Sequence, residues 1–567
     1  MSDNPVQTHS HTHTHSRPPH SHSDSEVGSF AADTHQFHLA DQPKSNDIEA
    51  GTQTEHVPSN EPDVTTTESE HDLHGLIHRK AITILDHLRA RTKRILRWLA
   101  ILAYWLVLLI PLGCLIGVAA AFFLYSIDLV TKWRFSQPWL LYLLPVSGLI
   151  QGLIYSRWSK HGLEPGSTIG YGVDLIIDQV HRPHSVKARA SVPWRMGWMA
   201  WIGTCLSHLC GASVGREGTG LQIAASISGW YIWCVRYVTR GRVILGKHTI
   251  RLMTIASMAA GFGSVFGTPF GGVIFSLEVL VIGPILTEAL IPCIIASCTA
   301  DIVSTAMLEV VGIDHSRYLK SMEELSHPHV RIEMVLLICV AATFFGIVAR
   351  GFSKCIYLVQ HVFRALIPSA YKPRAGLIIP TVGSGLVILL VVIWNTRDYL
   401  GIGTIRPSGD TDTVIIGTCF STETACHDYS FVAKWIFTVV SLAIGFKGGE
   451  VTSLFFIGAS CGYAVAQWLN VSGDTQLFAS IGFVSVFGAA ANTPLASTVM
   501  ACELFGGTHV IYYAIGCYVA YAVSGQSGIY HAQLREQKKL VSYRTARNQS
   551  EQEHKEDTSQ RPRGRSV

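Results

Sequence analysis

The chain has 567 residues, of which 48% are hydrophobic and only 15% are charged, and its formal net charge is +4. Soluble proteins carry about 25% charged residues, so this composition excludes an ordinary soluble protein. The small net charge gives no sign of nucleic-acid binding, and the thirteen scattered cysteines show no CxxC spacing for a metal.

Residues 1–78 are rich in Ser, Thr, His and acidic residues and poor in aliphatic ones. We predict that this tail is disordered, because it cannot bury enough apolar surface to offset the entropy lost on ordering. Its dense histidines have two interpretations, a weak zinc or copper site or pH-dependent patch, and a plain solvated tail. The second is favoured because nothing holds the ligands in place. The histidines are His9, His11, His13, His15, His20 and His22.

A basic segment at 79–97 comes directly before the first apolar run. It predicts an amphipathic helix at the membrane interface and, by the positive-inside rule, a cytoplasmic N-terminus. From Trp98 to Ile127 there are thirty residues without a charge, more than the roughly 20 that span a bilayer. The run is too long, and starts too late, for a signal peptide. The chain is therefore predicted to be an all-α polytopic membrane protein.

The apolar segments fall into two halves, 98–306 and 333–531, which are separated by a polar connector at 307–332 and followed by a polar tail at 532–567. Several segments are shorter than a full span or are interrupted by Gly and Pro, which favours tilted, partial helices that converge on a central site. The segments are 98–131, 138–157, 194–210, 219–238, 250–264, 268–306, 333–366, 376–394, 431–446, 451–469, 477–505 and 508–524.

One short motif carries the strongest functional signal. Gly215-Arg216-Glu217-Gly218-Thr219 begins an apolar segment, so a glycine turn is expected to start a helix at membrane depth. The first N–H groups of a helix are unpaired and carry partial positive charge, which makes such a start an anion site. An ionisable residue inside the membrane is costly and marks a candidate functional site.

A similar motif recurs in the second half as Gly448-Gly449-Glu450-Val451-Thr452. Further along each half, Thr268-Pro269 leads to Glu278 and Thr493-Pro494 leads to Glu503, with nine residues from Pro to Glu in both. Landmarks repeated in the same order predict an internal duplication, an architecture in which transporters place interrupted helices around a midplane site. Chance matches in glycine-rich apolar sequence are the alternative.

Glu217 has a functional and a structural interpretation. As a gate, its carboxylate competes with the transported anion when ionised and leaves when protonated, which couples protons to anions. As structure, it is an acid favoured by the helix dipole. Its apolar frame and the adjacent Arg216 favour the gate. Glu450 is equally well explained as a buried cap, and the hydroxyls of Thr219 and Thr452 as anion donors or as backbone-bonded side chains.

Two further segments leave alternatives open. Residues 164–175 form a third glycine-rich helix start, which either adds to the central site or is an extramembrane turn. Cys419 and Cys426 flank a polar loop and would pair only if that loop faces an oxidising compartment.

These motifs resemble those of the CLC family of anion channels and anion/proton antiporters. Gly215 to Gly218 matches the GREG motif, Gly448-Gly449 matches the second glycine motif, and the segment from Thr268 to Glu278 and the late Tyr530 match later landmarks. The resemblance covers about 95–531. It implies a CLC-type inverted repeat with broken helices, a homodimer, and Glu217 as the gating carboxylate.

Within the family, GREGT and GGEVT are more similar to the fluoride-exporting subclass than to the chloride members. The resemblance implies that bound anion lies near Thr452 and Tyr530, and that Tyr171 takes the place of a central serine. With the helix starts, the candidate anion-binding residues are Arg216, Gly218, Thr219, Tyr171, Val451, Thr452 and Tyr530.

The sequence departs from the patterns of the family at three places. Ser453 stands where a proline is expected, and Val173-Asp174 replaces Asn-Asn, although a carboxylate there would repel an anion unless it is protonated or paired. Val279 occupies the position at which chloride/proton exchangers carry a second, internal glutamate. These departures concern the identity of the anion and the proton route.

We therefore expect halide movement, of fluoride or chloride, coupled to protons through Glu217, with no enzymatic activity and no cofactor or metal. The expected partners of the chain are the halide, protons, the bilayer and a second copy of the chain. Both termini are expected to be cytoplasmic. A passive chloride channel is the first alternative. A divalent-metal transporter and a transport-inactive membrane sensor are alternatives of other classes; His208 stands alone on its segment and supports no metal site.

Overall fold

The computed structural model describes residues 67–158, 172–181, 194–240, 245–283, 285–313, 331–407, 410, 412–420, 426–526 and 528–535, with side-chain detail from His87 onward. The chain forms two units, Met1–Leu85 and Asp86–Val567; helix α1 begins in the first, and the packing and the sites described below belong to the second.

The described residues are almost entirely helical, as predicted. The longer helices are α1 (Thr67–Ser136), α2 (Leu144–Trp158), α3 (Gly172–His181), α5 (Trp194–Cys210), α6 (Glu217–Val238), α7 (Lys247–Phe266), α8 (Pro269–Glu278), α9 (Leu290–Val311), α10 (Ile332–Leu366), α11 (Ala375–Trp394), α12 (Ser430–Ala443), α13 (Val451–Trp468), α14 (Thr475–Ala491), α15 (Pro494–Phe505) and α16 (Val510–Ser524). Short 3-10 helices are η1 (Pro138–Leu143), η2 (Thr287–Ala289), η3 (Ser369–Arg374), η4 (Ile416–Phe420), η5 (Ser472–Asp474) and η6 (Gly507–His509). Two strands, β1 (Val281–Ile282) and β2 (Leu534–Arg535), pair in parallel.

Six helical stretches within the described residues are long and apolar enough to cross a membrane. They include most of α1, α7, α9 and α10, and α2 and α11 together with the 3-10 turns before them. Most of the other helices are shorter, although α6 has 22 residues, and α14 is buried over almost its whole length. The prediction of a multi-pass membrane protein with full and partial helices is confirmed.

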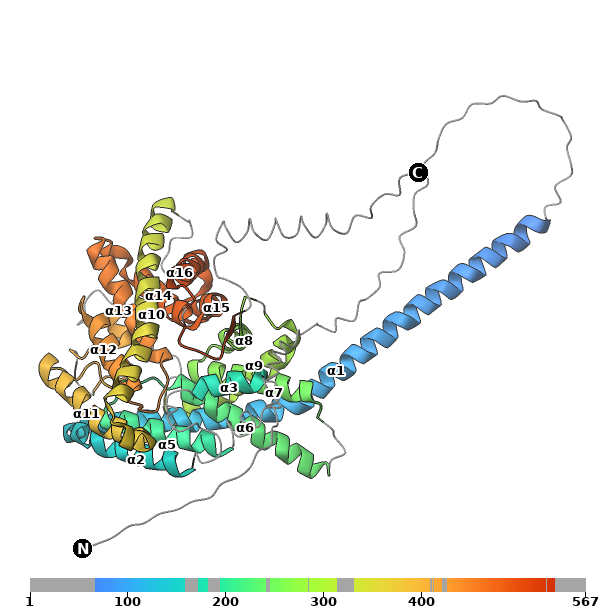
Figure 1. Cartoon of the computed structure of the whole chain (residues 1–567). Helices are drawn as coiled ribbons and strands as arrows, with labels where there is room; N and C mark the ends of the chain where they lie inside the picture. Colours follow the sequence, from blue (N-terminus) through green and yellow to red (C-terminus); the bar gives the residue numbers. More distant parts are fainter. Residues whose placement is uncertain are drawn as a thin grey trace, which may run out of the picture. The chain divides into compact units, whose positions relative to one another are not determined.

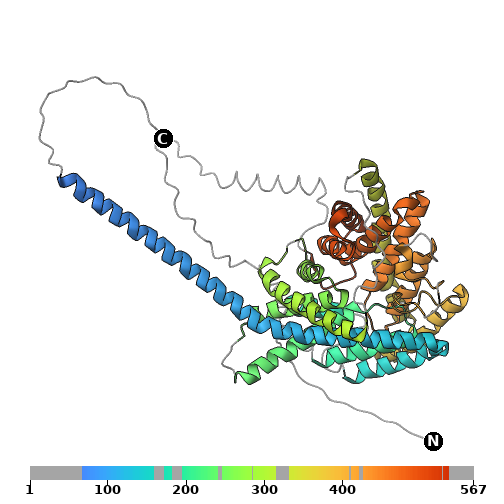
Figure 2. The ribbon, with the colours of Figure 1, turned by 180° about the vertical axis from the view of Figure 1, so that it is seen from behind.

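The two halves repeat one order of elements. Helices α6, α7, α8 and α9 correspond to α13, α14, α15 and α16, and η1–α2 corresponds to η3–α11. Equivalent helices meet: α2 packs on α11, and α8 packs on α15. Figures 1 and 2 show these pairs from opposite sides, with the first half in blue to green and the second in yellow to red.

A reciprocal pair of contacts relates the two halves by an approximate two-fold. The carboxylate of Glu278, at the end of α8, accepts from the backbone N–H groups of Leu495 and Ala496, at 3.1 and 2.8 Å. The carboxylate of Glu503, at the end of α15, accepts from Phe270 and Gly271 at 2.9 and 2.7 Å. Each helix end thus caps the start of its counterpart, which only a two-fold relation permits.

A sharp local break separates α7 from α8 and α14 from α15, and the second break lies inside the predicted run 477–505. Gly267 and Asn492 adopt the left-handed conformation at φ 71° and 60°, and Pro269 and Pro494 start the next helices. A left-handed residue ends a helix, and a proline at the first position starts one without losing a hydrogen bond. The repeated landmarks are therefore the corners at which each half turns inside the membrane.

The ends of the predicted segments differ from the observed ones. Helix α1 already begins at Thr67, inside the segment predicted as a disordered tail, and runs through 79–97 into the first span without a break. The acidic residues after Thr67 suit a helix start. At the other end, Gln533 is buried in what was predicted as a polar tail, because its amide pairs with Asn492 and with the carbonyl of Ala491.

Cys419 and Cys426 form a disulfide. The bond joins η4 to the start of the segment that leads into α12. The pairing that the sequence left open is therefore present.

Candidate anion-binding site

The two glycine motifs meet at the centre of the second unit. Gly215 and Gly449 form an antiparallel bridge, in which Gly215 N–H donates to the Gly449 carbonyl at 2.5 Å and Gly449 N–H to the Gly215 carbonyl at 2.8 Å. A Cβ on Gly215 would lie 2.9 Å from the Gly449 oxygen and from Oε2 of Glu217. Glycine is needed at this position because the two backbones approach too closely for a side chain.

The bridge brings the side chain of Glu217 onto the other half. Glu217 is fully buried, and its Oε2 accepts from the backbone N–H of Thr452 at 3.1 Å. Oε1 accepts from the hydroxyl of the same threonine. Oε2 also accepts from the N–H of Arg216 at 3.1 Å, and the Arg216 Nε lies 3.4 Å from Oε1.

This geometry places a negative group on the N-terminus of α13. Glu450 is the residue that precedes the helix, and Val451 and Thr452 are its first two residues. The N–H of Thr452 is one of the donors that a helix start leaves unpaired. The carboxylate of Glu217 thus occupies an anion position built by the helix dipole, a backbone N–H and a hydroxyl.

Thr219 lies differently from Thr452, although the two stand at similar places in the repeat. Its hydroxyl is 2.6 Å from the hydroxyl of Thr204 on α5, and both side chains are buried. Among the described residues, the hydroxyl of Thr219 contacts Thr204 rather than Glu217 and so fixes α6 against α5. Gly218 is held through its carbonyl, which accepts from the amide of Gln222 at 3.1 Å.

A small cavity of about 30 Å³ lies beside the glycine bridge, and its lining includes Glu450, Asp174 and Tyr530. The Tyr530 hydroxyl is buried and has no hydrogen-bond partner among the described residues, so it is free to donate to a ligand. Asp174 is paired: its carboxylate accepts from the N–H of Ala532 at 3.1 Å. The expected repulsion between Asp174 and an anion is reduced by this contact.

An aromatic wall closes the site on the side of α7, α8 and α14. The ring of Tyr530 meets Phe275 edge to face, with centroids 6.4 Å apart, and Phe275 stacks on Phe262 at 4.2 Å. Phe487, which is the repeat equivalent of Phe262, completes the cluster. Such a wall excludes water, so the polar groups at the site act in a medium of low dielectric constant.

The structure brings together Arg216, Glu217, Gly218, Val451 and Thr452, all of which the sequence singled out. Tyr530 is near through the adjoining cavity, and Tyr171 lies outside the described residues. Sequence reasoning missed Thr204 and Gln222. Neither belongs to a motif, and only the packing of α5 and the turn of α6 gives them a role.

The described residues contain no group of three or more His, Cys, Asp and Glu side chains that would hold a metal ion. His208 is buried on α5, and its neighbours are cations rather than acids. This part of the chain therefore gives the metal-transporter alternative no support.

The chain was compared with known proteins. A family model described as "Voltage gated chloride channel" matches residues 147–525. A "Chloride/fluoride channel protein" of Pseudomonas syringae pv. tomato is 39% identical over 441 residues, which cover 76% of this chain and 86% of that protein. A "Putative chloride channel protein ClcB-like" of Ralstonia nicotianae is 25% identical over 57% of this chain and 71% of that protein.

Solved structures give the same picture. The crystal structure of a CLC-type fluoride/proton antiporter aligns with a TM-score of 0.62 and 26% identity, over 77% of this chain and 98% of that one. A slow cyanobacterial Cl⁻/H⁺ antiporter aligns with a TM-score of 0.56 at 18% identity, over 74% of this chain and 94% of that one. The second likeness concerns the fold alone.

Proposed function

Given that the chain belongs to the voltage-gated chloride channel family, also called CLC, and so transports anions, we propose that it moves a halide across the membrane in exchange with protons. The observation that carries this proposal is the carboxylate of Glu217 on the N-terminus of α13. An ionised Glu217 competes directly with an anion for the donors of Thr452. Protonation removes the charge of Glu217, so the side chain no longer outcompetes an anion at this position.

The exchange cycle follows from this competition. When Glu217 takes up a proton and swings away, the N–H and hydroxyl of Thr452 become available to a halide, and the hydroxyl of Tyr530 supplies a further donor nearby. When Glu217 releases its proton, the carboxylate returns and displaces the halide. Because one position holds either the carboxylate or the halide, proton and anion movements are linked. The donors must replace hydration and still release the ion.

We favour fluoride over chloride as the halide. The GREGT and GGEVT signatures support this choice, as does the likeness to proteins whose names include fluoride. Fluoride is a small, strongly hydrated ion that needs hydrogen-bond donors to replace its water. The site offers charge-assisted donors rather than a wide apolar cavity.

Halide efflux from liposomes that hold the purified chain tests the proposal, with fluoride and chloride compared at several pH values and proton uptake recorded together with the anion. We expect fluoride efflux with proton uptake in a fixed ratio. Chloride flux without proton movement would replace the proposal with the passive channel. Absence of any anion flux in folded protein would favour the transport-inactive alternative.

We also propose the orientation and the assembly. The basic segment at 79–97 places the N-terminus in the cytoplasm. Helix α1 then crosses the membrane, so its end at Ser136 faces the opposite side, as the Cys419–Cys426 disulfide supports. The C-terminus is assigned to the cytoplasm and the chain to a homodimer, as the family resemblance implies. Accessibility labelling of single introduced cysteines checks the orientation, and cross-linking in the membrane checks the dimer.

A further inference from the structure

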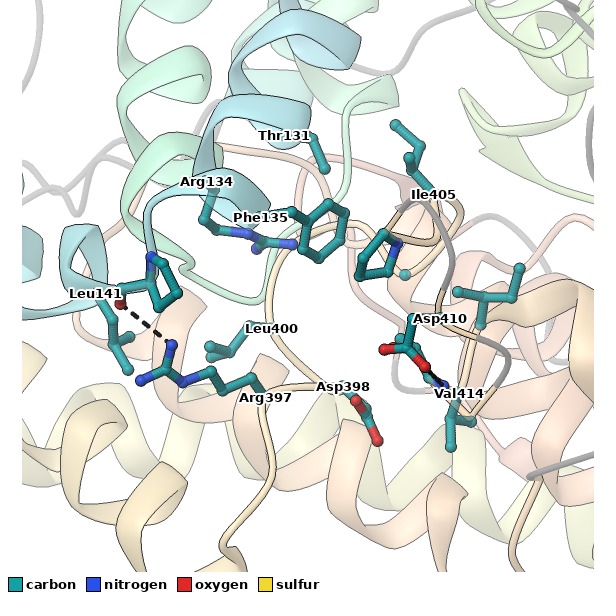
Figure 3. A pocket seen from close by; sticks show the side chains of 15 residues that line it. Thr131, Arg134, Phe135, Leu141, Arg397, Asp398, Leu400, Ile405, Asp410 and Val414 are labelled. Atoms are coloured by element: carbon teal, nitrogen blue, oxygen red, sulfur yellow. Dashed lines mark hydrogen bonds between the residues drawn. The ribbon is translucent and has the colours of Figure 1, made fainter.

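A cavity of about 230 Å³ lies between the end of α1 and the loop that joins α11 to α12. Figure 3 shows Arg134 and Phe135 on one side of it and Asp398 and Asp410 on the other. The cavity is separate from the glycine bridge, and none of its lining residues belongs to the two glycine motifs. We propose that it is an outer binding station for a small inorganic anion on the route to or from Glu217. The position of this cavity on the outer side of the membrane rests on the orientation proposed above.

Arg134 is the first reason. Only 9% of its surface is exposed, yet it forms no ion pair with a described carboxylate, and its Nη1 has no hydrogen-bond partner among the described residues. Its guanidinium carbon lies 4.8 Å from the centroid of the Phe135 ring. A buried cation that lacks an anion is costly, so a bound anion in this cavity would be the missing partner.

The backbone is shaped around this cation. Gly401 and Gly403 have positive φ values of 61° and 75°, which glycine adopts without strain. A side chain at Gly401 would collide with Nη1 of Arg134. The same loop binds a second buried cation: Lys434 Nζ donates to the carbonyls of Tyr399 and Gly401 at 3.1 and 2.7 Å. The loop thus packs around two buried basic side chains.

The positive charges continue to the central site. Arg134, Lys434 and Arg216 all act electrostatically on the buried ring of His208. Arg216 in turn lies against Glu217. The basic residue in the cavity and the one beside Glu217 therefore act on one shared buried group, and their positive charge lowers the energy of an anion in this region.

The two acidic residues that line the cavity interact with the loop itself. The Asp410 carboxylate accepts from the hydroxyl of Thr413 at 2.5 Å and from the N–H of Asp412 at 2.9 Å. Asp398 is partly buried, and this burial raises the pKa of its carboxyl and so favours the neutral form. The remaining cation, Arg397, donates to the carbonyl of Pro138 at 3.2 Å at the rim. Arg134 is left as the lining cation whose Nη1 has no acceptor among the described residues.

Bromide provides a direct test, because its anomalous scattering locates it in crystals of the full chain. We expect a bromide peak within hydrogen-bonding distance of the Arg134 guanidinium, which Arg134→Gln removes and Arg134→Lys keeps. The exposed Arg374, which lies outside the cavity, supplies the control Arg374→Gln and should leave the peak in place. A bromide-free cavity in the wild-type chain would overturn the proposal, as would a rubidium ion bound between Asp398 and Asp410 instead.

Transport supplies the second readout. Arg134→Gln should raise the half-saturating halide concentration about tenfold, the size expected from one lost charge-assisted hydrogen bond, and change the maximal rate little. An unchanged half-saturating concentration in folded Arg134→Gln protein would count against the station. Bromide binding does not require transport, so bromide at Arg134 in a chain without halide flux would refute only the proposed function. Halide flux without bromide at Arg134 would refute only the outer station.

Discussion

The starts of α6 and α13 are equivalent positions of one repeat, yet the structure uses them in different ways. Glu217 reaches across the glycine bridge and sits on the donors of Thr452. Glu450, its counterpart, faces the small cavity that it shares with Asp174 and Tyr530. The hydroxyl of Thr452 therefore binds Glu217, whereas that of Thr219 binds Thr204. A duplicated motif has thus divided into a carboxylate and the helix start that receives it.

The largest effect should come from removing the charge on each glutamate in turn. Glu217→Gln should abolish proton coupling, with a fall of at least about 100-fold in anion-coupled proton flux, because an amide cannot carry the proton. Glu450→Gln should slow transport but keep the ratio of protons to anions. Simultaneous anion and proton recordings from liposomes measure both. If both variants lost coupling alike, the two helix starts would have the same role.

The second largest difference between the halves is expected at the two threonines. Thr452→Val removes the hydroxyl that holds the Glu217 carboxylate, so the gate should leave more readily and the halide should leak without protons, by about tenfold. Thr219→Val loses only its contact with Thr204 and should leave coupling unchanged. The ratio of halide to proton flux in each variant checks this. Tight coupling in folded Thr452→Val protein would contradict the geometry.

The glycine bridge should be sensitive to a single methyl group. Gly215→Ala places a Cβ 2.9 Å from Glu217 Oε2 and the Gly449 oxygen, and overpacking of this kind costs about 1–3 kcal/mol of unfolding free energy. Gly385→Ala in α11 is the control, because a Cβ there meets nothing within 4 Å. Apparent melting temperatures in detergent should fall for the first and hold or rise slightly for the second. Equal values would show that the bridge tolerates a side chain.

The smallest effect is expected for variants at the reciprocal contacts between α8 and α15. Glu278→Gln and Glu503→Gln each weaken one cap between α8 and α15, by about 1 kcal/mol. Glu503 also interacts with Asp301 of like charge, so its neutralisation relieves repulsion and should cost less. Thermal unfolding of both single variants and the double variant measures the difference. A greater loss of stability for Glu503→Gln than for Glu278→Gln would contradict this expectation.

Much of the site follows from the sequence because its parts are local. A glycine turn, an adjacent charge and an apolar helix are all contained in the residues from Gly215 to Trp230. The repeated Thr-Pro corners likewise marked the breaks before α8 and α15. The disulfide was left open because its formation depends on which side of the membrane the loop faces. The contact of Asp174 with Ala532 was not foreseen, because it joins residues far apart in the chain.

By itself, the sequence determined that the chain crosses a membrane, is duplicated and starts two helices with glycine and glutamate. These properties are encoded in apolar run lengths and short motifs, which depend on neighbouring residues alone. Only the tertiary structure decided that Glu217 binds Thr452 across 235 residues, that Thr219 turns to Thr204, and that Arg134 is buried without a counter-charge. Each of these depends on which helices pack together, because burial and the supply of hydrogen-bond partners are properties of the packed assembly.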